Sequence, residues 1–204
     1  MTHPHILALV AVFATLVVVG LAGAGLAGMP PDFAVSVVAL PIGLLVAGAV
    51  MLWRGQADRL AAWSARLGAG LAAGLAATLV YNLYRVGVRL VFDMPFDPFR
   101  VQPVFGQILT GLPSTHAGAL VAGWSYHLWI GAMLGMVLAA LRPRGGLIAG
   151  ALFAAAIQLG RWAMYPAVFR AGLVDNEFFA NGVIGILLWG MVLGITLAAI
   201  SRRF

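Results

Sequence analysis

The chain has 204 residues, of which 63% are apolar and 9% are charged, and its mean hydropathy is +1.02. A soluble domain is about half apolar and about a quarter charged, so this composition excludes an ordinary soluble protein and indicates an integral membrane protein. The chain has no cysteine, which excludes disulfides and thiolate chemistry. Its net charge of +6 comes from arginine at the expected membrane edges, so it does not indicate a nucleic-acid partner.

Six long apolar runs predict an all-α, polytopic membrane protein whose single transmembrane domain covers residues 1–204. Each run is near the roughly 20 residues that a helix needs to cross a bilayer. The runs are continuous rather than short and alternating, which favours helices over a β-barrel. The first run lacks a basic segment before it and is too long for a signal peptide, so we interpret it as a span. The six predicted spans cover about 6–27, 33–53, 67–91, 117–141, 146–168 and 179–200.

The arginines predict how the spans are oriented. On one side of the predicted spans lie seven arginines: Arg54, Arg59, Arg66, Arg142, Arg144, Arg202 and Arg203. The other side holds Asp32, Asp93, Asp97, Asp175 and Glu177, against Arg100 and Arg170. Because cytoplasmic loops are enriched in basic residues, both termini are expected in the cytoplasm, with the chain in a bacterial inner membrane.

The one long connection, 92–116, is expected on the outer side. It reads DMPFDPFRVQPVFGQILTGLPSTH from Asp93, and its four prolines prevent a continuous helix. Its phenylalanines would hold it at the membrane interface. We predict a surface loop with a short amphipathic turn around 104–109, and the alternative is a lid over an outward-facing cavity.

Two segments of the chain resemble each other and predict a tandem helical-hairpin repeat. The run Gly131–Arg144 matches Gly190–Arg203, and the third span matches the fifth when they are offset by 76 residues. The matched pairs are Gly70 with Gly146, Gly74 with Gly150, Gly131 with Gly190, Gly135 with Gly194, and Arg85 with Arg161. Spans 1 and 2 are a candidate third copy. Gly-x-x-x-Gly pairs also serve close helix packing, and chance matches are common in a chain rich in alanine and glycine.

Polar side chains within the spans converge on the predicted outer half of the bundle. From the helical rise, Arg85 lies roughly 28 Å beyond Arg66 along the third span. The candidate ligand-binding residues are Arg85, Arg161, His127, His116, Gln158, Tyr81, Arg89 and Asn181. One interpretation is an outward-opening polar cavity in which the two arginines hold an anion or a lipid head group. The other is that the arginines pair with outer-loop acids and fasten the loops to the helices.

No catalytic, metal or cofactor site is evident in the sequence. Pro113-Ser-Thr-His116 resembles one element of the membrane-bound acid phosphatases of the PAP2 type, but the lysine-containing and downstream histidine motifs of that family are missing. Ser114 or Thr115 as the N-cap of the fourth span explains the same residues. A haem would need a partner histidine on another span, and none is there. His127 is instead expected to form a hydrogen bond with Tyr81 or Gln158.

The run Tyr126-His-Leu-Trp-Ile-Gly131 and the ending from Glu177 to Gly194 resemble a widespread group of small bacterial multi-helix inner-membrane proteins. The resemblance covers roughly the third to sixth spans and implies no activity. In that group the sixth span often carries a histidine where this chain has Ile186, which weakens a paired-histidine site.

These features predict a non-enzymatic membrane protein that binds or transports a small polar or anionic ligand, or a lipid, through an outward-facing polar cavity. The alternative is a non-catalytic accessory subunit of a larger membrane complex. The expected partners are membrane lipids together with other membrane subunits or further copies of the chain, and no nucleic acid.

Overall fold

The computed structural model describes residues 33–93, 97–142, 144–164 and 179–202, and over these ranges the chain is helical without a strand. Four helices in this part are long and apolar enough to cross a membrane. They cover Ala34–Trp53, Ala57–Val91, Ala117–Leu141 and Gly182–Ser201. These apolar helices indicate a membrane protein.

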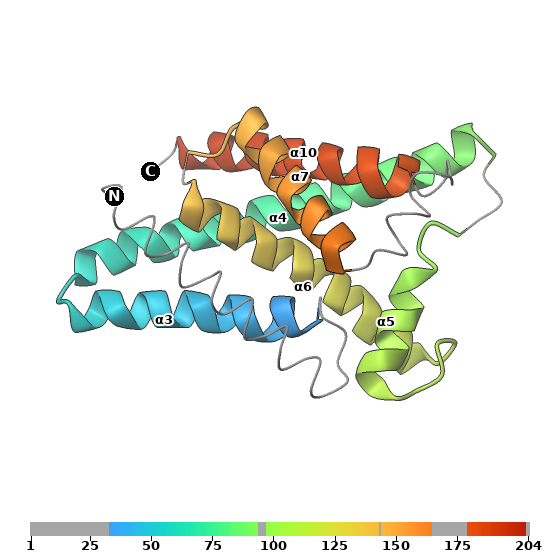
Figure 1. The fold of residues 1–204 in the computed structure, drawn as a ribbon, viewed down its shortest axis with the longest axis horizontal. Coiled ribbons are helices and arrows are strands. Elements are labelled where there is room, and N and C mark those ends of the chain that lie inside the picture. The colour runs from blue at the N-terminus through green and yellow to red at the C-terminus, as the bar shows by residue number, and fades with distance from the viewer. Residues whose placement is uncertain (1–32, 94–96, 143, 165–178, 203–204) are drawn as a thin grey trace.

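The helical elements follow in chain order (Figure 1). They are η1 (Ala34–Ala39), α3 (Leu40–Trp53), α4 (Ala57–Val91), α5 (Val101–Thr110), α6 (Ala117–Leu141), α7 (Leu147–Met164), η2 (Phe179–Ile184) and α10 (Gly185–Ser201). The elements η1 and η2 are π-helical turns that lead directly into α3 and α10. α6 occupies the residues of the fourth predicted span, whereas the first predicted span, 6–27, lies outside the described residues.

α4 begins at Ala57, well before the predicted start of the third span near residue 67. The turn after α3 is short and contains Gly55 at φ +66°. The segment that follows is rich in alanine, leucine and arginine, which have high helix propensity, and Asp58 in the first turn favours the positive end of the helix dipole. Arg59 and Arg66 are therefore residues of a long helix rather than of a loop.

The connection 92–116 contains a helix, α5, where the sequence predicts only a turn. Pro103 is the third residue of α5, a position whose backbone N–H would have no partner within the helix, so the proline is tolerated. Gly111 ends α5 in the left-handed conformation at φ +70°. α5 packs on the first half of α6, where methyl groups at Gly106 and Gly123 would overlap the carbonyl oxygens of the facing helix.

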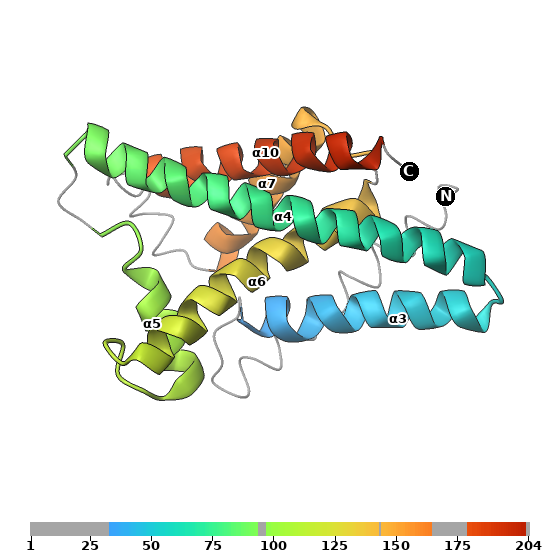
Figure 2. The ribbon, with the colours of Figure 1, turned by 180° about the vertical axis from the view of Figure 1, so that it is seen from behind.

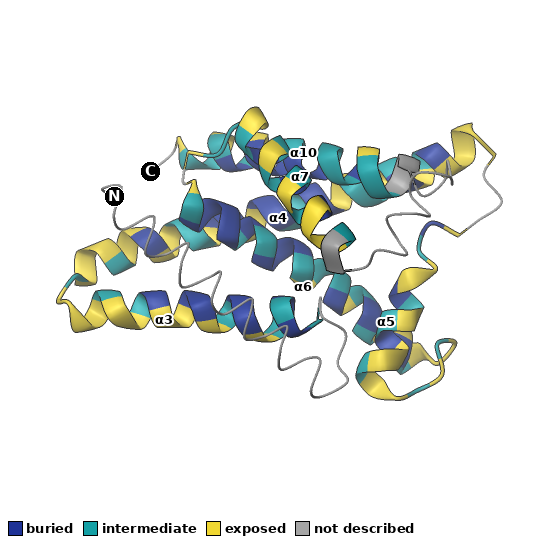
Figure 3. Cartoon of the chain, in the orientation of Figure 1, coloured by how far each residue is buried: buried dark blue, intermediate teal, exposed yellow. Residues whose placement is uncertain are grey.

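α4 is the central helix, with α6 and α10 packed against it, and α7 packs on α10 (Figures 1 and 2). Both views show α4 and α6 crossing and then diverging toward the C-terminal end of α4. Buried residues line the inward faces of these helices, whereas the outward faces of α3 and α4 are largely exposed (Figure 3). In a membrane, those exposed apolar side chains would contact lipid.

Glycines bring the backbones of α4 and α6 together where the two helices cross. A Cβ at Gly74 would overlap the carbonyl oxygen of Gly131, and one at Gly135 would overlap that of Gly70. A Cβ at Gly131 would also overlap the hydroxyl oxygen of Thr78. Such close approach requires residues without a side chain on both helices.

A second glycine crossing joins α7 to α10. A Cβ at Gly150 would overlap the carbonyl oxygen of Gly190, and one at Gly194 would overlap that of Gly146. A Cβ at Gly190 would also overlap the Ala154 methyl group. The N–H of Gly146 donates to the carbonyl oxygen of Gly194 at 2.8 Å, which fastens the start of α7 to α10.

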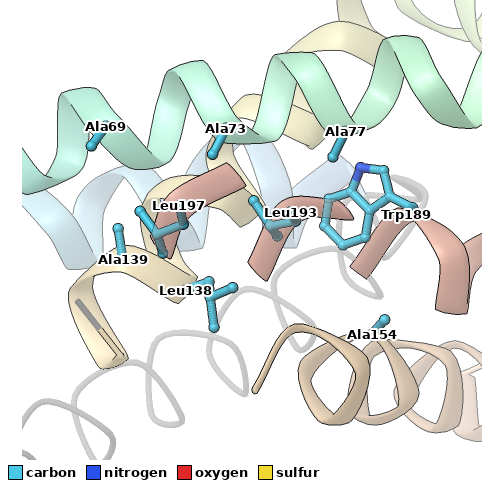
Figure 4. Close-up of a cluster of buried hydrophobic side chains, with 9 residues drawn as sticks. All are labelled: Ala69, Ala73, Ala77, Leu138, Ala139, Ala154, Trp189, Leu193 and Leu197. Carbon is cyan, nitrogen blue, oxygen red and sulfur yellow. The ribbon is translucent and has the colours of Figure 1, made fainter. Parts of the chain in front are cut away.

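The core between α4 and α10 combines small residues of one helix with large residues of the other (Figure 4). Ala73 and Ala77 of α4 are fully buried and leave room for Leu193 and Leu197 of α10. The whole cluster is Ala69, Ala73, Ala77, Leu138, Ala139, Ala154, Trp189, Leu193 and Leu197. A second cluster joins Leu40, Leu44 and Ala47 of α3 to Trp63, Met133, Val137 and Ala140.

Candidate functional site

Arg85 is the most deeply buried charged residue that the structure describes. It lies near the C-terminal end of α4 with 9% of its surface exposed. The guanidinium carbon lies 5.3 Å from the ring centroid of Tyr81, one turn earlier on α4, and 5.0 Å from that of Phe99. Two cation–π contacts thus partly compensate the loss of hydration of the charge.

The segment that leads into α5 contributes the other contacts of Arg85. The side chain of Gln102, on α5, is buried with 3% exposure. In the amide orientation that suits both of its ends, its nitrogen donates to the carbonyl oxygen of Phe99 at 2.6 Å, and its oxygen accepts from Nη1 of Arg85 at 3.2 Å. Asp97 stabilises the turn that precedes α5, because its Oδ1 accepts from the N–H of Phe99 at 2.8 Å.

The hydrogen-bond donors of the Arg85 guanidinium are not all satisfied. Its Nε is buried and has no hydrogen-bond partner among the described residues. A buried unpaired donor on a charged group is costly, and it is more so in a membrane, where water does not replace the missing partner. Arg85 lies within electrostatic range of Asp97, of opposite sign, and of Arg161, of like sign.

His127 of α6 extends the polar cluster between α4 and α6. Its Nε2 lies 2.9 Å from Oδ1 of Asn82, so the ring donates to the amide oxygen from this nitrogen. The imidazole stands edge-on to Trp124, with 5.9 Å between ring centroids, and lies 6.5 Å from the ring of Tyr81. Trp124 in turn packs on Phe99 at 5.0 Å, which connects this group to the surroundings of Arg85.

The second predicted arginine is in a different environment. Arg161 lies near the end of α7 and is exposed, whereas Gln158, one turn earlier, is buried with 5% exposure. In its better amide orientation, Gln158 donates to the carbonyl oxygen of Gly182 at 3.2 Å and accepts from Nε1 of Trp162 at 2.9 Å. Gln158 thus ties α7 to the start of the last span.

The remaining predicted site residues lie apart from this cluster or outside the residues that the structure describes. Arg89 is exposed one turn beyond Arg85. His116 is exposed and is the N-cap of α6, because its Nδ1 accepts from the N–H of Gly118 at 3.0 Å. The sequence suggested Ser114 or Thr115 as the N-cap. That prediction is wrong, because the N-cap is His116. Asn181 belongs to η2, and its side chain lies outside the described residues.

Four residues of the cluster were not predicted from the sequence: Asn82, Phe99, Gln102 and Trp124. Asn82 had a detectable signal, since it is three residues before Arg85 and therefore close to the same helix face. The expected partner of His127 was Tyr81 or Gln158, and the structure gives Asn82 instead. The contacts of Phe99 and Gln102 depend on how the outer connection folds back, which helical periodicity does not encode.

The cluster combines a buried guanidinium, a buried N–H donor without a partner among the described residues, and aromatic rings, which is a set of groups that suits an anion chemically. We compared the chain with protein-family models, with curated proteins and with solved structures, and none of the three comparisons found a match.

Proposed function

We propose that this membrane protein binds, and in its membrane transports, a small anionic ligand or lipid head group at Arg85. The observation that carries the proposal is the burial of this arginine together with the unpartnered Nε. An arginine inside a membrane span is costly, and such residues commonly mark substrate sites. An anion that accepts from Nε would supply both the missing hydrogen bond and the counter-charge.

The surrounding residues support the same function. Tyr81, Phe99 and Trp124 provide apolar surfaces, and Asn82 and His127 provide further hydrogen-bonding groups. Few polar groups set among aromatic side chains are typical of small-molecule sites. The competing interpretation is an internal ion pair of Arg85 with Asp175 or Glu177, both of which lie outside the described residues.

The test is ligand-dependent thermal stability of the purified protein in detergent. Propionate, inorganic phosphate and phosphatidylglycerol are titrated against the wild type, Arg85→Gln and Arg161→Gln. A ligand that binds only the folded state raises Tm. We expect at least one anion to stabilise the wild type and to lose this effect in Arg85→Gln. If every stabilising anion acts equally on Arg85→Gln, Arg85 is not the binding group.

The architecture that we propose for this function has six spans, both termini in the cytoplasm of a bacterial inner membrane, and a tandem hairpin repeat. The repeat is supported by contacts as well as by sequence. The pairs Gly74–Gly131 and Gly150–Gly190 are equivalent positions under the sequence offsets, and both pairs make the same backbone approach. Thr78 and Ala154 are equivalent as well, and each faces the second glycine of its pair.

The outward apolar face of α3 supports the alternative function, an accessory subunit of a larger membrane complex. Leu45 is 72% exposed and Trp53 is 85% exposed, so this face is available to lipid or to another membrane subunit. A pull-down from native membranes with a tagged chain tests it. Recovery of a stoichiometric membrane partner, in Arg85→Gln as in the wild type, would favour the subunit function. A lone monomer would oppose it.

A further inference from the structure

The free edge of the Arg85 guanidinium indicates how the site would hold an anion. Nη1 is already bound to the amide oxygen of Gln102. Nε and the neighbouring Nη2 form the remaining side of the planar fork. Two parallel donors on one side match the two oxygens of a carboxylate, which is the usual bidentate arrangement of arginine with this group.

The charge balance of the cluster favours a single negative charge. Arg85 and Arg161 contribute two positive charges within electrostatic range of each other, and Asp97 contributes one negative charge. Among the described residues that act electrostatically on Arg85, the balance is that of one cation, which a monoanion neutralises. A phosphate dianion would leave excess negative charge among poorly hydrated groups, where an unbalanced charge is costly.

Apart from these charged groups, aromatic rings surround the guanidinium. The rings of Tyr81 and Phe99 contact it, and Trp124 packs on Phe99. An apolar ligand tail would therefore be accommodated next to the carboxylate, where a strongly hydrated anion would lose its water without replacement.

We propose that the ligand of Arg85 is a monocarboxylate with an apolar tail, held through Nε and Nη2. This inference rests on the function proposed above and narrows it to one ligand class. Nε is buried in this structure and the Phe99 ring lies over the guanidinium, so in this proposal the segment that carries Phe99 and Gln102 moves aside when the ligand enters. α5 then acts as a lid, which was the alternative interpretation of the connection 92–116 from the sequence.

The experiment measures the affinity of the purified full-length protein for matched probes by isothermal titration calorimetry. The probes are propionate, phenylacetate, phenylacetamide and inorganic phosphate, with laurate as a membrane-derived carboxylate. We expect phenylacetate to bind at least about tenfold more tightly than phosphate, since phosphate would lose its stronger hydration without replacement among the apolar rings. The uncharged phenylacetamide should not bind measurably. Tighter binding of laurate than of phenylacetate would identify a fatty acid as the source of the carboxylate.

Three variants separate bidentate binding from simple charge attraction. Arg85→Lys retains the charge but not the planar fork, so phenylacetate affinity should fall about tenfold, and Arg85→Gln should abolish binding. Arg59→Gln changes an exposed arginine at the distant end of the same helix and should bind as the wild type does.

The outcomes distinguish the two proposals. If phosphate binds in an Arg85-dependent manner, or phosphatidylglycerol does so in the thermal-stability test, and the carboxylates do not, the monocarboxylate inference is wrong while the function stands. If Arg85→Lys binds phenylacetate as tightly as the wild type, the bidentate geometry is wrong. If no anion or anionic lipid shows Arg85-dependent binding, both proposals fail.

Discussion

Trp189 of α10 donates its indole N–H to the hydroxyl oxygen of Thr78 on α4 at 3.1 Å. Thr78 donates in turn to the carbonyl oxygen of Gly74 at 2.8 Å. Both side chains are buried: Thr78 is 2% exposed and Trp189 is 3% exposed. A hydrogen-bonded chain therefore joins the two packed helix pairs, α4–α6 and α7–α10, at the level of the first glycine crossing.

Thr78→Val is expected to destabilise the protein, because it keeps the side-chain shape while removing the acceptor for Trp189. The indole N–H would then be buried without a partner, at a cost of about 1–3 kcal/mol. Unfolding by denaturant in detergent micelles measures the loss. The double variant Thr78→Val/Trp189→Phe should lose less than the sum of the single variants. Strict additivity would show that the hydrogen bond contributes nothing.

Gly74→Ala is expected to weaken the crossing of α4 and α6. The new methyl group would overlap the carbonyl oxygen of Gly131, and overpacking of this kind costs about 1–3 kcal/mol. Gly87→Ala on the same helix is the matched control, since a Cβ there meets nothing within 4 Å. The thermal midpoint of Gly74→Ala should fall while that of Gly87→Ala stays or rises. Equal midpoints would argue against the close backbone approach.

The crossing of α7 and α10 should respond in the same way if the two hairpins are equivalent. Gly150→Ala places a methyl group on the carbonyl oxygen of Gly190, whereas Gly160→Ala on α7 meets nothing within 4 Å. We expect a loss in Gly150→Ala of similar size to that in Gly74→Ala, about 1–3 kcal/mol, and none in Gly160→Ala. A tolerated Gly150→Ala beside a damaging Gly74→Ala would contradict the proposed equivalence.

The Asn82–His127 hydrogen bond is expected to couple α4 to α6. Interhelical hydrogen bonds in membrane proteins are worth about 0.6 kcal/mol on average and up to about 1.7 kcal/mol. A double-mutant cycle with Asn82→Leu and His127→Phe measures the coupling, and a value in this range is expected. Zero coupling would mean that the two side chains act independently.

α5 should detach from α6 when its glycine contact is removed. Gly106→Val would force a branched side chain onto the carbonyl oxygen of Ala119. The chain contains no cysteine, so a single Gln102→Cys reports the position of α5 without background. A membrane-impermeant maleimide should label this cysteine slowly in the otherwise unchanged chain and faster by an order of magnitude with Gly106→Val. Equal labelling rates would show that this contact does not hold α5 closed.

The sequence predicted the parts of the structure that depend on local patterns. The apolar run of α6 predicted the bounds of that helix. The early start of α4 was missed because its exposed first turns are helical by propensity, not by hydropathy. The cap of α6 was assigned to Ser114 or Thr115 because histidine is not among the preferred cap residues.

The candidate site was predictable only where it lies on one helix. Tyr81 and Arg85 share a face of α4, and their contact follows from that spacing. The different exposure of Arg85 and Arg161 was not predictable from their equivalent places in the sequence. It arises because Phe99, just before α5, and Gln102, within α5, contact the Arg85 guanidinium. These are tertiary contacts between segments with no shared periodicity.

The central claim is that Arg85 holds an anionic ligand, and a structure determined with 3-bromopropionate tests it most directly. The bromine atom can be located by anomalous diffraction. Our account predicts the carboxylate on Nε of Arg85 with the bromine among Tyr81, Phe99 and Trp124, and no such signal in Arg85→Gln. A carboxylate of Asp175 or Glu177 on Nε, with bromine absent from the cluster, would contradict the account and identify Arg85 as half of an internal ion pair.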